Sequence, residues 1–466
     1  MFNLDDTIVA LATPPGVGAI GVIRLSGKGA IDIAQSVFHG KDLRQQASHT
    51  VHFGTIRDEE GRILDEVLAT LFVAPRSYTG EHVVEISCHG SNYILQEVIQ
   101  LFIRKGARLA MPGEFTLRAF LNGRLDLSQA EAVADLIASS SAAAHQIAMQ
   151  QMRGGVSDEI KRLRDQLIDF ASLIELELDF SEEDVEFADR SQLRELTGRI
   201  QKLLHTLIES FKLGNAIKQG VSTVIAGRPN AGKSTLLNAL LNEERAIVSE
   251  IAGTTRDTIE EALVIQGVQF RIIDTAGIRE AHDAIEAIGV ARTLEKVRQS
   301  AVLLYVFDVV RTQPAQLRQD LEQLVHPDVK VLLVANKMDL NPYTLFEHYF
   351  PPEAQESLRI GPEQWVPISA INRMNIDYLK EKLLGAVISG EVSLDGAVVS
   401  NARHFEALNK ASESLAAVEQ GMAAGVSSDF LAMDIRRALH YLGEITGEIS
   451  TEDLLGNIFG KFCIGK

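Results

Sequence analysis

The chain has 466 residues, 46% of them hydrophobic, and a formal net charge of −18 at pH 7; because a single hydrophobic core stops growing near ~250–300 residues, we expect two or three domains. The acidic balance is a poor match for a nucleic-acid backbone, so an RNA partner has to be held by a local basic patch or by another subunit. Two cysteines, no signal-peptide pattern and no apolar run near ~18 residues exclude a disulfide framework and a membrane-spanning helix, which leads us to expect a reducing, cytoplasmic location.

Residues 1–122 mix short strands with Gly and Pro turns, which predicts an α+β domain. The apolar runs 22–25 and 83–86 read as strands, and apolar residues on one face predict a helix over 91–105. The stretch 16–21 matches a dinucleotide-binding fingerprint by letter. It follows two prolines and runs into a strand-like segment instead of opening a helix, so a dinucleotide fold is not favoured.

Residues 123–215 are dominated by helical periodicity, interrupted by an acidic run that we interpret as a solvated loop. Ser128 and Glu131 are spaced as a capping box, which predicts that Ser128 caps a long Ala-rich helix. Residues 389–466 predict helices again. We expect Ser450 to cap the last one, and one apolar stripe in the preceding helix contains Leu431, Ile435, Leu439, Leu442 and Ile445.

Residues 216–388 repeat a pattern of strand, Gly-rich turn and helix. The apolar runs 221–226, 302–307 and 330–335 lack alternation, as buried parallel strands do, which predicts a doubly wound α/β unit. Because helix-rich sequence flanks this unit on both sides, the simplest architecture is a multidomain α/β protein in which the α/β unit is inserted into one helical domain.

The segment Gly227-Arg-Pro-Asn-Ala-Gly-Lys-Ser234 matches the P-loop pattern, with a strand before it and helix-like sequence after it. In such a loop successive backbone N–H groups surround phosphates at a helix N-terminus. We expect Lys233 to reach the β- and γ-phosphates of a nucleotide and the Ser234 hydroxyl to bind Mg²⁺.

Further motifs follow in the order that a GTP-binding protein requires. A hydroxyl of Thr255 can join the Mg²⁺ shell when a γ-phosphate is present, Asp274 supports that shell, and Asp339 can accept two hydrogen bonds from guanine that adenine cannot offer. A backbone N–H of Ser369-Ala370 closes the base pocket. The residues expected from these motifs to bind GTP and Mg²⁺ are Ala231, Gly232, Lys233, Ser234, Thr235, Gly253, Thr254, Thr255, Asp274, Thr275, Ala276, Gly277, Asn336, Lys337, Asp339, Ser369 and Ala370.

Hydrolysis of GTP requires a group that orients the attacking water. Many small G proteins place a water-orienting Gln directly after the glycine equivalent to Gly277, and here that residue is Ile278. The amide oxygen of Asn230 could hold a monovalent cation beside the phosphates, or Asn230 could simply stabilise the loop through hydrogen bonds.

At this point the chain resembles the bacterial tRNA modification GTPases, which act on the wobble uridine of certain tRNAs. The blocks that carry the resemblance span essentially the whole chain: 12–26, 112–122, 227–234, 246–257 and 462–466. One departure is the loop Ile371–Asn375, where the family usually has glycines. The resemblance implies a G domain between a folate-binding-like N-terminal domain and a helical domain.

The resemblance also implies a K⁺ site around Asn230, Ser249, Ile251 and Thr254, in a loop that includes Glu250 and Ala252. It implies that Glu286 is the catalytic acidic residue, although its spacing from Asp283 also fits a helix cap. The residues expected to contact a 5-formyl- or methylene-tetrahydrofolate are Arg24, Glu85, Arg124 and Lys466.

Cys463 is implied to act near that one-carbon site, whereas the plain interpretation from its spacing is a small buried residue on the apolar stripe of the last helix. Arg24 and Glu85 could equally be ordinary cross-strand residues. Cys88 and His89, adjacent on a strand, point to opposite faces and are not expected to cooperate.

The partners implied are a second copy of the chain, a flavin-dependent subunit that supplies basic surface, and tRNA. The expected function is K⁺-dependent GTP hydrolysis coupled to addition of a carboxymethylaminomethyl-type group at C5 of uridine 34. The alternative is a regulatory GTP switch, for example in ribosome assembly, with no covalent chemistry on tRNA. Binding of a reduced folate would favour the first.

Overall fold

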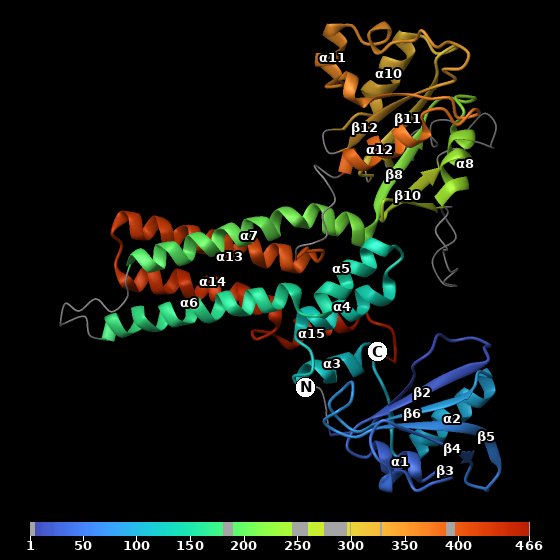
Figure 1. Ribbon diagram of the computed structural model, residues 1–466, viewed down its shortest axis with the longest axis vertical. Helices are drawn as coiled ribbons and strands as arrows, with labels where there is room; N and C mark the ends of the chain where they lie inside the picture. The colour runs from blue at the N-terminus through green and yellow to red at the C-terminus, as the bar shows by residue number, and fades with distance from the viewer. Residues whose placement is uncertain are drawn as a thin grey trace. The chain divides into compact units, whose positions relative to one another are not determined.

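The computed structural model describes residues 5–179, 190–244, 260–274, 296–298, 300–326, 329–387 and 397–465 (Figure 1). The chain divides into two compact units. Unit 1 contains residues 1–134, 151–194 and 414–466, and unit 2 contains residues 135–150 and 195–413.

Unit 1 begins with a seven-stranded sheet in the order β3-β4-β5-β6-β2-β1-β7, antiparallel except where β7 pairs parallel with β1. Helices α1 and α2 pack on one of its faces, where Leu95, Val98 and Phe102 of α2 are buried against strand residues. The elements are β1 (Ile8–Leu11), β2 (Ile20–Ser26), α1 (Ala30–Gln35), β3 (Phe38–His39), β4 (Thr50–Arg57), β5 (Ile63–Phe72), β6 (Val83–His89), α2 (Asn92–Arg104), β7 (Arg108–Leu109) and α3 (Glu114–Leu121).

These bounds confirm the predicted strands at 22–25 and 83–86 and the helix at 91–105. Gly21 lies inside β2 and pairs with Cys88 of antiparallel β6, so the glycine stretch at 16–21 is no strand–turn–helix. Cys88 is buried and its neighbour His89 is exposed, as their alternation along β6 predicts.

The helices of the remaining chain include α6 and α14, which run side by side (Figure 1). Leu431, Ile435, Leu442 and Ile445 of α14 are buried, and Leu439 is half-buried. The helices are α4 (Leu127–Ala138), α5 (Ala142–Met152), α6 (Gly155–Asp179), α7 (Arg190–Gln219), α13 (Ala402–Ala424), α14 (Ser428–Thr446) and α15 (Glu452–Phe459).

Three expectations about helix ends were wrong. The Ala-rich region forms three helices, α4 to α6, and not one. The reciprocal cap at the start of α4 joins Asp126 and Gln129, each accepting the other's backbone N–H at 2.9 Å, while Ser128 is buried inside the helix. Thr451 and not Ser450 caps α15, because its side chain accepts the Leu454 N–H at 3.2 Å.

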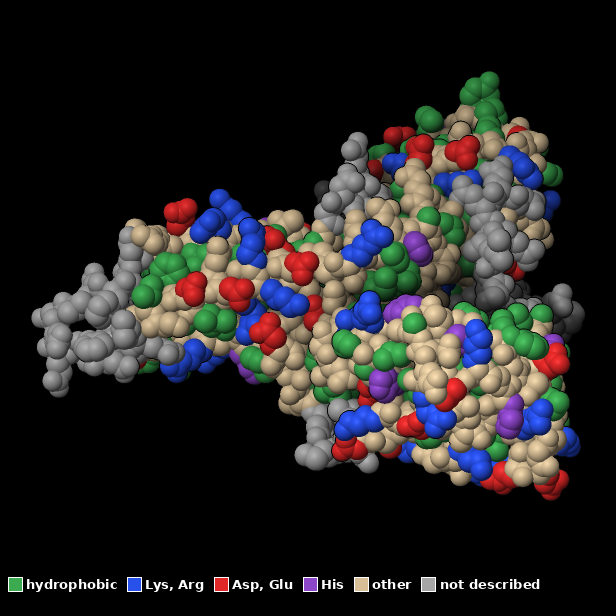
Figure 2. Space-filling view, turned by 60° about the horizontal axis from the view of Figure 1, so that its bottom comes forward, with side chains coloured by type: hydrophobic (Ala, Val, Ile, Leu, Met, Phe, Trp, Pro, Cys, Tyr) green, Lys and Arg blue, Asp and Glu red, His purple; other side chains and the backbone are tan. Residues whose placement is uncertain are grey.

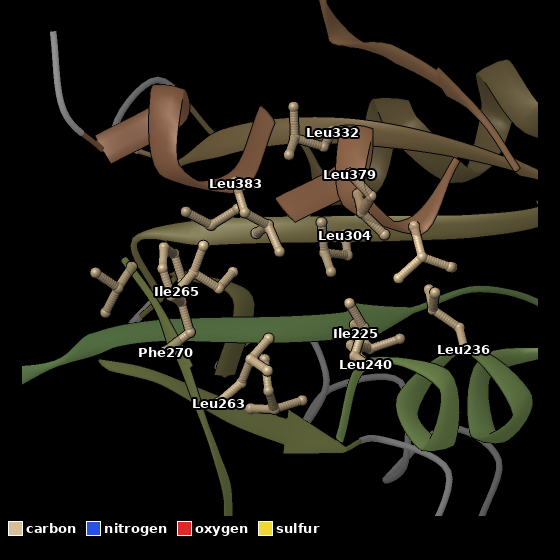
Figure 3. Close-up of a cluster of buried hydrophobic side chains, with 14 of the residues drawn as sticks. Ile225, Leu236, Leu240, Leu263, Ile265, Phe270, Leu304, Leu332, Leu379 and Leu383 are labelled. Carbon is tan, nitrogen blue, oxygen red and sulfur yellow. The ribbon is translucent and has the colours of Figure 1, made fainter. Parts of the chain in front are cut away.

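Unit 2 contains a six-stranded sheet in the order β13-β12-β11-β8-β10-β9, in which only the edge strand β9 runs antiparallel. One face is covered by α8 and α12, whose leucines pack on β8 and β11 (Figure 3). Helix α10 covers the other face. The elements are β8 (Val221–Ala226), α8 (Lys233–Glu244), β9 (Glu260–Ile265), β10 (Val268–Asp274), β11 (Val302–Asp308), α10 (Pro314–Leu324), β12 (Lys330–Asn336), α11 (Pro352–Leu358), β13 (Trp365–Pro367) and α12 (Ile376–Val387).

Residues of α5 share the core of this sheet. Ala143 and Ile147 are buried in the same cluster as Ile265 and Val268 of the β9–β10 hairpin. The hairpin turn rests on α5: Gly267 has a φ of +84°, and a Cβ atom added there would lie 2.8 Å from the Cβ of Ala143. This contact requires a glycine for two independent reasons, the backbone conformation and the space.

The described surface carries charges of both signs. In the view of Figure 2, Lys and Arg side chains are interspersed with Asp and Glu side chains. Among the described helices, none has both the length and the apolar character that crossing a bilayer requires.

Candidate functional site

The P-loop, residues 227–234, connects the end of β8 to the start of α8, and its shape depends on two glycines. A Cβ at Gly227 would lie 2.0 Å from the Val306 carbonyl oxygen, and a Cβ at Gly232 would lie 2.3 Å from Asn336 Nδ2. Both glycines also have positive φ angles, 148° and 93°. The loop therefore approaches its neighbours more closely than any side chain permits, which leaves its backbone groups facing the end of β8.

Lys233 is the first residue of α8, and its side chain bends back over the loop. Its Nζ donates to the carbonyl oxygens of Gly227 at 2.9 Å and Arg228 at 3.0 Å. The residue is 8% exposed. Ser234 and Thr235, expected to contact Mg²⁺ and the nucleotide, follow it on the first helical turn and are exposed. The ammonium and the helix N-terminus thus concentrate positive potential at one point, which is a suitable place for phosphate.

Asn336, at the end of β12, joins the P-loop to the loop after β13. Its Nδ2 donates to the Ala231 carbonyl at 2.8 Å, and its Oδ1 accepts the N–H groups of Lys337 at 2.8 Å and Ala370 at 3.0 Å. The side chain is 2% exposed. One buried amide therefore joins the P-loop, which lies 105 positions earlier in the sequence, to the segment around Lys337 and to the loop at Ala370.

Lys337 lies across the same site. Its Nζ donates to the Asn230 carbonyl at 3.0 Å and to Asp308 Oδ2 at 2.7 Å. Burial alone would raise the pKa of Asp308, but the ion pair with Lys337 and backbone N–H donors hold that pKa below its ordinary value. The carboxylate therefore stays charged and fixes the lysine stem beside the loop.

The expected base-binding residues surround this junction. The Asp339 side chain is exposed, whereas Ser369 and Ala370 are buried. The Ser369 and Ala370 N–H groups donate within the protein, to Met374 O at 3.2 Å and to Asn336 Oδ1. In the loop that follows, Arg373 and Asn375 have φ angles of 54° and 60°, left-handed conformations that glycine adopts more readily than other residues.

Part of the expected site lies outside the described residues. This applies to Ser249, Glu250, Ile251, Ala252, Gly253, Thr254, Thr255, Thr275, Ala276, Gly277, Glu286 and Lys466, and to the side chain of Asp274, whose backbone ends β10. Of the expected cation ligands, Asn230 and Ser234 are described. Asn230 is exposed and has a φ of +61°.

A second group of expected residues comes together in unit 1. Arg24 on β2 donates from Nε to Glu85 Oε1 on β6 at 2.8 Å, and from Nη1 to the Gly465 carbonyl at 3.4 Å. Its guanidinium lies 5.7 Å from the ring centroid of Tyr78 and 5.6 Å from that of Phe115. The guanidinium of Arg24 is therefore held by one carboxylate and lies close to two aromatic rings.

The C-terminal tail runs along this group. Ile464 forms an antiparallel bridge with Pro112, and the Cys463 carbonyl accepts the Gly113 N–H at 3.4 Å. The interpretation of Cys463 as a buried residue of the last helix was wrong, because α15 ends at Phe459 and the thiol is exposed. Burial, in contrast, raises the pKa of the Cys88 thiol to about 12, which makes it a poor nucleophile.

Arg124 is exposed and lies beside Gly80, where an added Cβ would be 3.4 Å from Arg124 Cγ. The structure therefore does not join it to the pair formed by Arg24 and Glu85. The sequence interpretation missed Asp308, although a polar residue ending a buried strand beside the P-loop strand was a usable signal. It also missed the pairing of Arg228 with Asp320, for which no local pattern exists.

Comparison with known families matches nearly the whole chain. The family described as "MnmE helical domain" matches residues 127–463, and the family described as "GTP-binding protein TrmE N-terminus" matches residues 7–124.

Individual relatives also match the chain over its whole length. A protein of Cytophaga hutchinsonii named tRNA modification GTPase MnmE is 57% identical over 464 residues, covering 100% of this chain and 98% of the relative. One of the same name from Christiangramia forsetii is 54% identical over 474 residues and covers 100% of both. A solved structure of an Aquifex aeolicus Era variant bound to GDP and AlF4⁻ is 28% identical and covers 42% of this chain and 66% of that one; its TM-score of 0.28 is too low to support any argument.

Proposed function

Since the chain belongs to the MnmE family of tRNA modification GTPases, we propose that it hydrolyses GTP at the P-loop of unit 2 in a K⁺-dependent way, as part of the modification of tRNA. The observation that supports this most directly is the junction at Asn336, which ties the P-loop to the expected base-binding loop. Lys233, already turned toward the loop, contacts the β- and γ-phosphates in this proposal, and Asp339 recognises guanine.

The donor chemistry at the described positions suits the two cations. Mg²⁺ and K⁺ both prefer oxygen ligands, and Ser234 offers an exposed hydroxyl while Asn230 offers an exposed amide oxygen. When bound, these cations offset the negative charge that builds up on the phosphates during transfer. Asn230 has a left-handed φ of +61°, its carbonyl accepts Lys337 Nζ, and its exposed side chain is the part that would reach the cation.

Hydrolysis rates in K⁺ and Na⁺ at constant ionic strength test this proposal. We expect the wild-type rate to be much higher in K⁺ and Asn230→Ala to remove the difference while GDP binding stays near normal. Equal wild-type rates in the two salts would exclude the K⁺ site. A protein that binds neither GDP nor GTP in the presence of Mg²⁺ would exclude the proposed nucleotide site altogether.

We further propose that the cluster of Arg24, Glu85 and the C-terminal tail in unit 1 binds a tetrahydrofolate with a one-carbon group. The cation between Tyr78 and Phe115 and the nearby carboxylate fit a flat pterin ring that carries hydrogen-bonding groups. The folate would supply the carbon that is added to the base. The exposed Cys463 stands at the edge of this cluster with its thiol accessible, in keeping with a chemical role.

Two partners complete the proposal. The face of the N-terminal sheet opposite α1 and α2 exposes Val51, Phe53 and Leu68, at 56%, 65% and 45%, and Phe53 and Leu68 are direct cross-strand neighbours. Apolar residues grouped on one open sheet face favour a homodimer. A flavin-dependent subunit provides the remaining chemistry, in the cytoplasm, and the basic surface for tRNA that a chain of net charge −18 offers poorly.

Mass spectrometry of wobble nucleosides is the decisive measurement for the reaction. In tRNA from a strain that lacks this protein, we expect the carboxymethylaminomethyl-type group at C5 of uridine 34 to be absent, and to return when the wild-type chain is supplied. Unchanged wobble nucleosides together with a ribosome-assembly defect would favour a regulatory GTP switch instead.

A further inference from the structure

Arg228, the second residue of the P-loop, has a main chain and a side chain that serve different partners. Its carbonyl oxygen accepts Lys233 Nζ at 3.0 Å and the Ala231 N–H at 3.3 Å. This peptide group, together with the Gly227 carbonyl, therefore fixes the position of the lysine ammonium, and it also contacts the middle of the loop.

The side chain of Arg228 is held by helix α10. Its Nε donates to Asp320 Oδ2 at 2.7 Å and its Nη2 to Asp320 Oδ1 at 2.9 Å, which is a two-pronged pairing of fixed geometry. Helix α10 is itself fixed, because Leu317 and Leu321 are fully buried beneath it. The arginine is 41% exposed and the aspartate 23%, so the pair is screened in part by water.

Tyr305 connects this pair to the sheet. Its hydroxyl donates to Asp320 Oδ2, and the residue is 2% exposed on β11. Burial, with the neighbouring aspartate, raises the pKa of Tyr305, so the hydroxyl remains a donor at neutral pH. In the sheet Tyr305 pairs with Ala226, the residue immediately before the P-loop. The side chains of Arg228, Asp320 and Tyr305 thus link the P-loop to helix α10 and strand β11.

We propose that Arg228, held by Asp320 and Tyr305, is a positioning residue that fixes the Lys233 ammonium where the β-phosphate of the nucleotide is bound. This proposal rests on the proposed function, since it assumes that the P-loop binds a guanine nucleotide. We call the linked side chains of Arg228, Asp320 and Tyr305 the clamp. The clamp orders the P-loop before the nucleotide binds, so less conformational entropy is lost on binding.

The test measures GDP affinity by displacement of a fluorescent GDP from the full-length protein. Asp320→Ala and Arg228→Met should each weaken GDP binding about 3- to 5-fold, the upper part of the range expected for a partly exposed charge pair. Because both variants break the same link, the double variant should be no weaker than the worse single one. Tyr305→Phe keeps the ring and should weaken binding about 2-fold.

Two controls separate positioning from general damage. GMP has the guanine but no β-phosphate, so displacement by GMP should be unchanged in the clamp variants. Asp377→Ala removes another aspartate of the same domain, 3.5 Å from Lys380, and should leave GDP affinity unchanged. Thermal unfolding followed by circular dichroism confirms that each variant is folded at the assay temperature.

The proposal is overturned if GDP and GMP affinities fall by the same factor, or if the losses of the single variants multiply in the double variant. Either result leaves the proposed function intact, because wild-type binding is measured first. If the wild-type protein bound no GDP, the proposed nucleotide site would fail instead, and the clamp would have nothing to position.

Discussion

In the candidate site of unit 2, the P-loop is one run of eight residues, 227–234, held by Asn336 and Lys337 from the end of β12 and by Asp320 from α10. The cluster in unit 1 is assembled differently, because Arg24 and Gly465, which touch at 3.4 Å, are 441 positions apart. The loop of the first site is therefore one continuous segment, although the side chains that hold it come from residues about a hundred positions later in the same domain. The second exists only when both ends of the chain have folded together.

The comparison predicts that the two sites differ most in their tolerance of backbone change. Gly227→Ala would place a methyl group 2.0 Å from the Val306 carbonyl at a φ of +148°, and should cost about 4 kcal/mol of unfolding free energy. Urea unfolding followed by the fluorescence of Trp365, the single tryptophan, reports on this domain alone. Gly385→Ala, in open space on α12, is the matched control and should not destabilise. Equal effects of the two substitutions would contradict the steric argument.

The sites should also be separable by ligand. Lys233→Ala removes the buried ammonium and should weaken GDP binding about 100-fold, while folate binding stays unchanged. Calorimetry with each ligand measures both. Lys330→Ala removes an exposed lysine from the same domain and should change neither affinity. A simultaneous loss of folate binding in Lys233→Ala would mean that the two sites are coupled and not independent.

The converse substitution sharpens the comparison from the other side. Arg24→Met removes the guanidinium that meets Glu85 and the tail, and should weaken binding of a reduced folate about 10-fold with GDP affinity unchanged. Fluorescence titration provides the measurement. Arg44→Met serves as control, since that arginine pairs with Asp42 on the surface of the same unit. If Arg24→Met and Arg44→Met bound folate equally well, the cluster would not be a folate site.

The smallest expected effect is that of low pH on the free energy of unfolding. In unit 1, hydrogen bonds from Arg108, followed by Arg118, hold the pKa of Asp6 below its ordinary value; Glu114 also has a lowered pKa, because the two arginines outweigh its burial. Both carboxylates stabilise the fold fully above their unfolded pKa values near 4, and this contribution is lost as the pH falls through the lower folded values.

Unfolding free energies from urea titrations followed by circular dichroism should therefore be flat from pH 7 to about 5 and fall by roughly 1–2 kcal/mol below pH 4. Glu114→Gln should reduce this slope. A rise in stability on acidification would show that these carboxylates are not stabilised as ions.

The two regions also differ in what the sequence could predict. The strands beside the P-loop, the loop itself and Asn336 were predicted because each depends on neighbours in the chain or on a buried parallel strand. The tail cluster could be expected only through family resemblance, since no periodicity connects Arg24 with Gly465. Cys463 shows where prediction from periodicity stops. Its spacing from Leu455 and Phe459 placed it on the apolar face of the last helix, but that helix ends at Phe459 and the thiol is exposed.

The predictions of the helix-capping residues were wrong for a local reason. Ser128 and Ser450 both had the right residue type and spacing for a cap, but Asp126 and Thr451 compete for the same role one or two residues away. Which polar side chain reaches the free N–H group depends on the path of the entering chain, and spacing alone does not determine that path.

The direct contact between Gly267 and Ala143 couples helix α5 to the six-stranded sheet. Strands β9 and β10 form a hairpin at the edge of that sheet, where β10 is also hydrogen-bonded to β8, and the far ends of the hairpin, at residues 260 and 274, continue into the two segments expected to meet the γ-phosphate and its metal. Since the turn touches α5 and β10 pairs with the strand that leads into the P-loop, α5 is packed against the same sheet that carries the loop. A bulkier residue at position 267 would therefore have to displace α5 or the edge of this sheet.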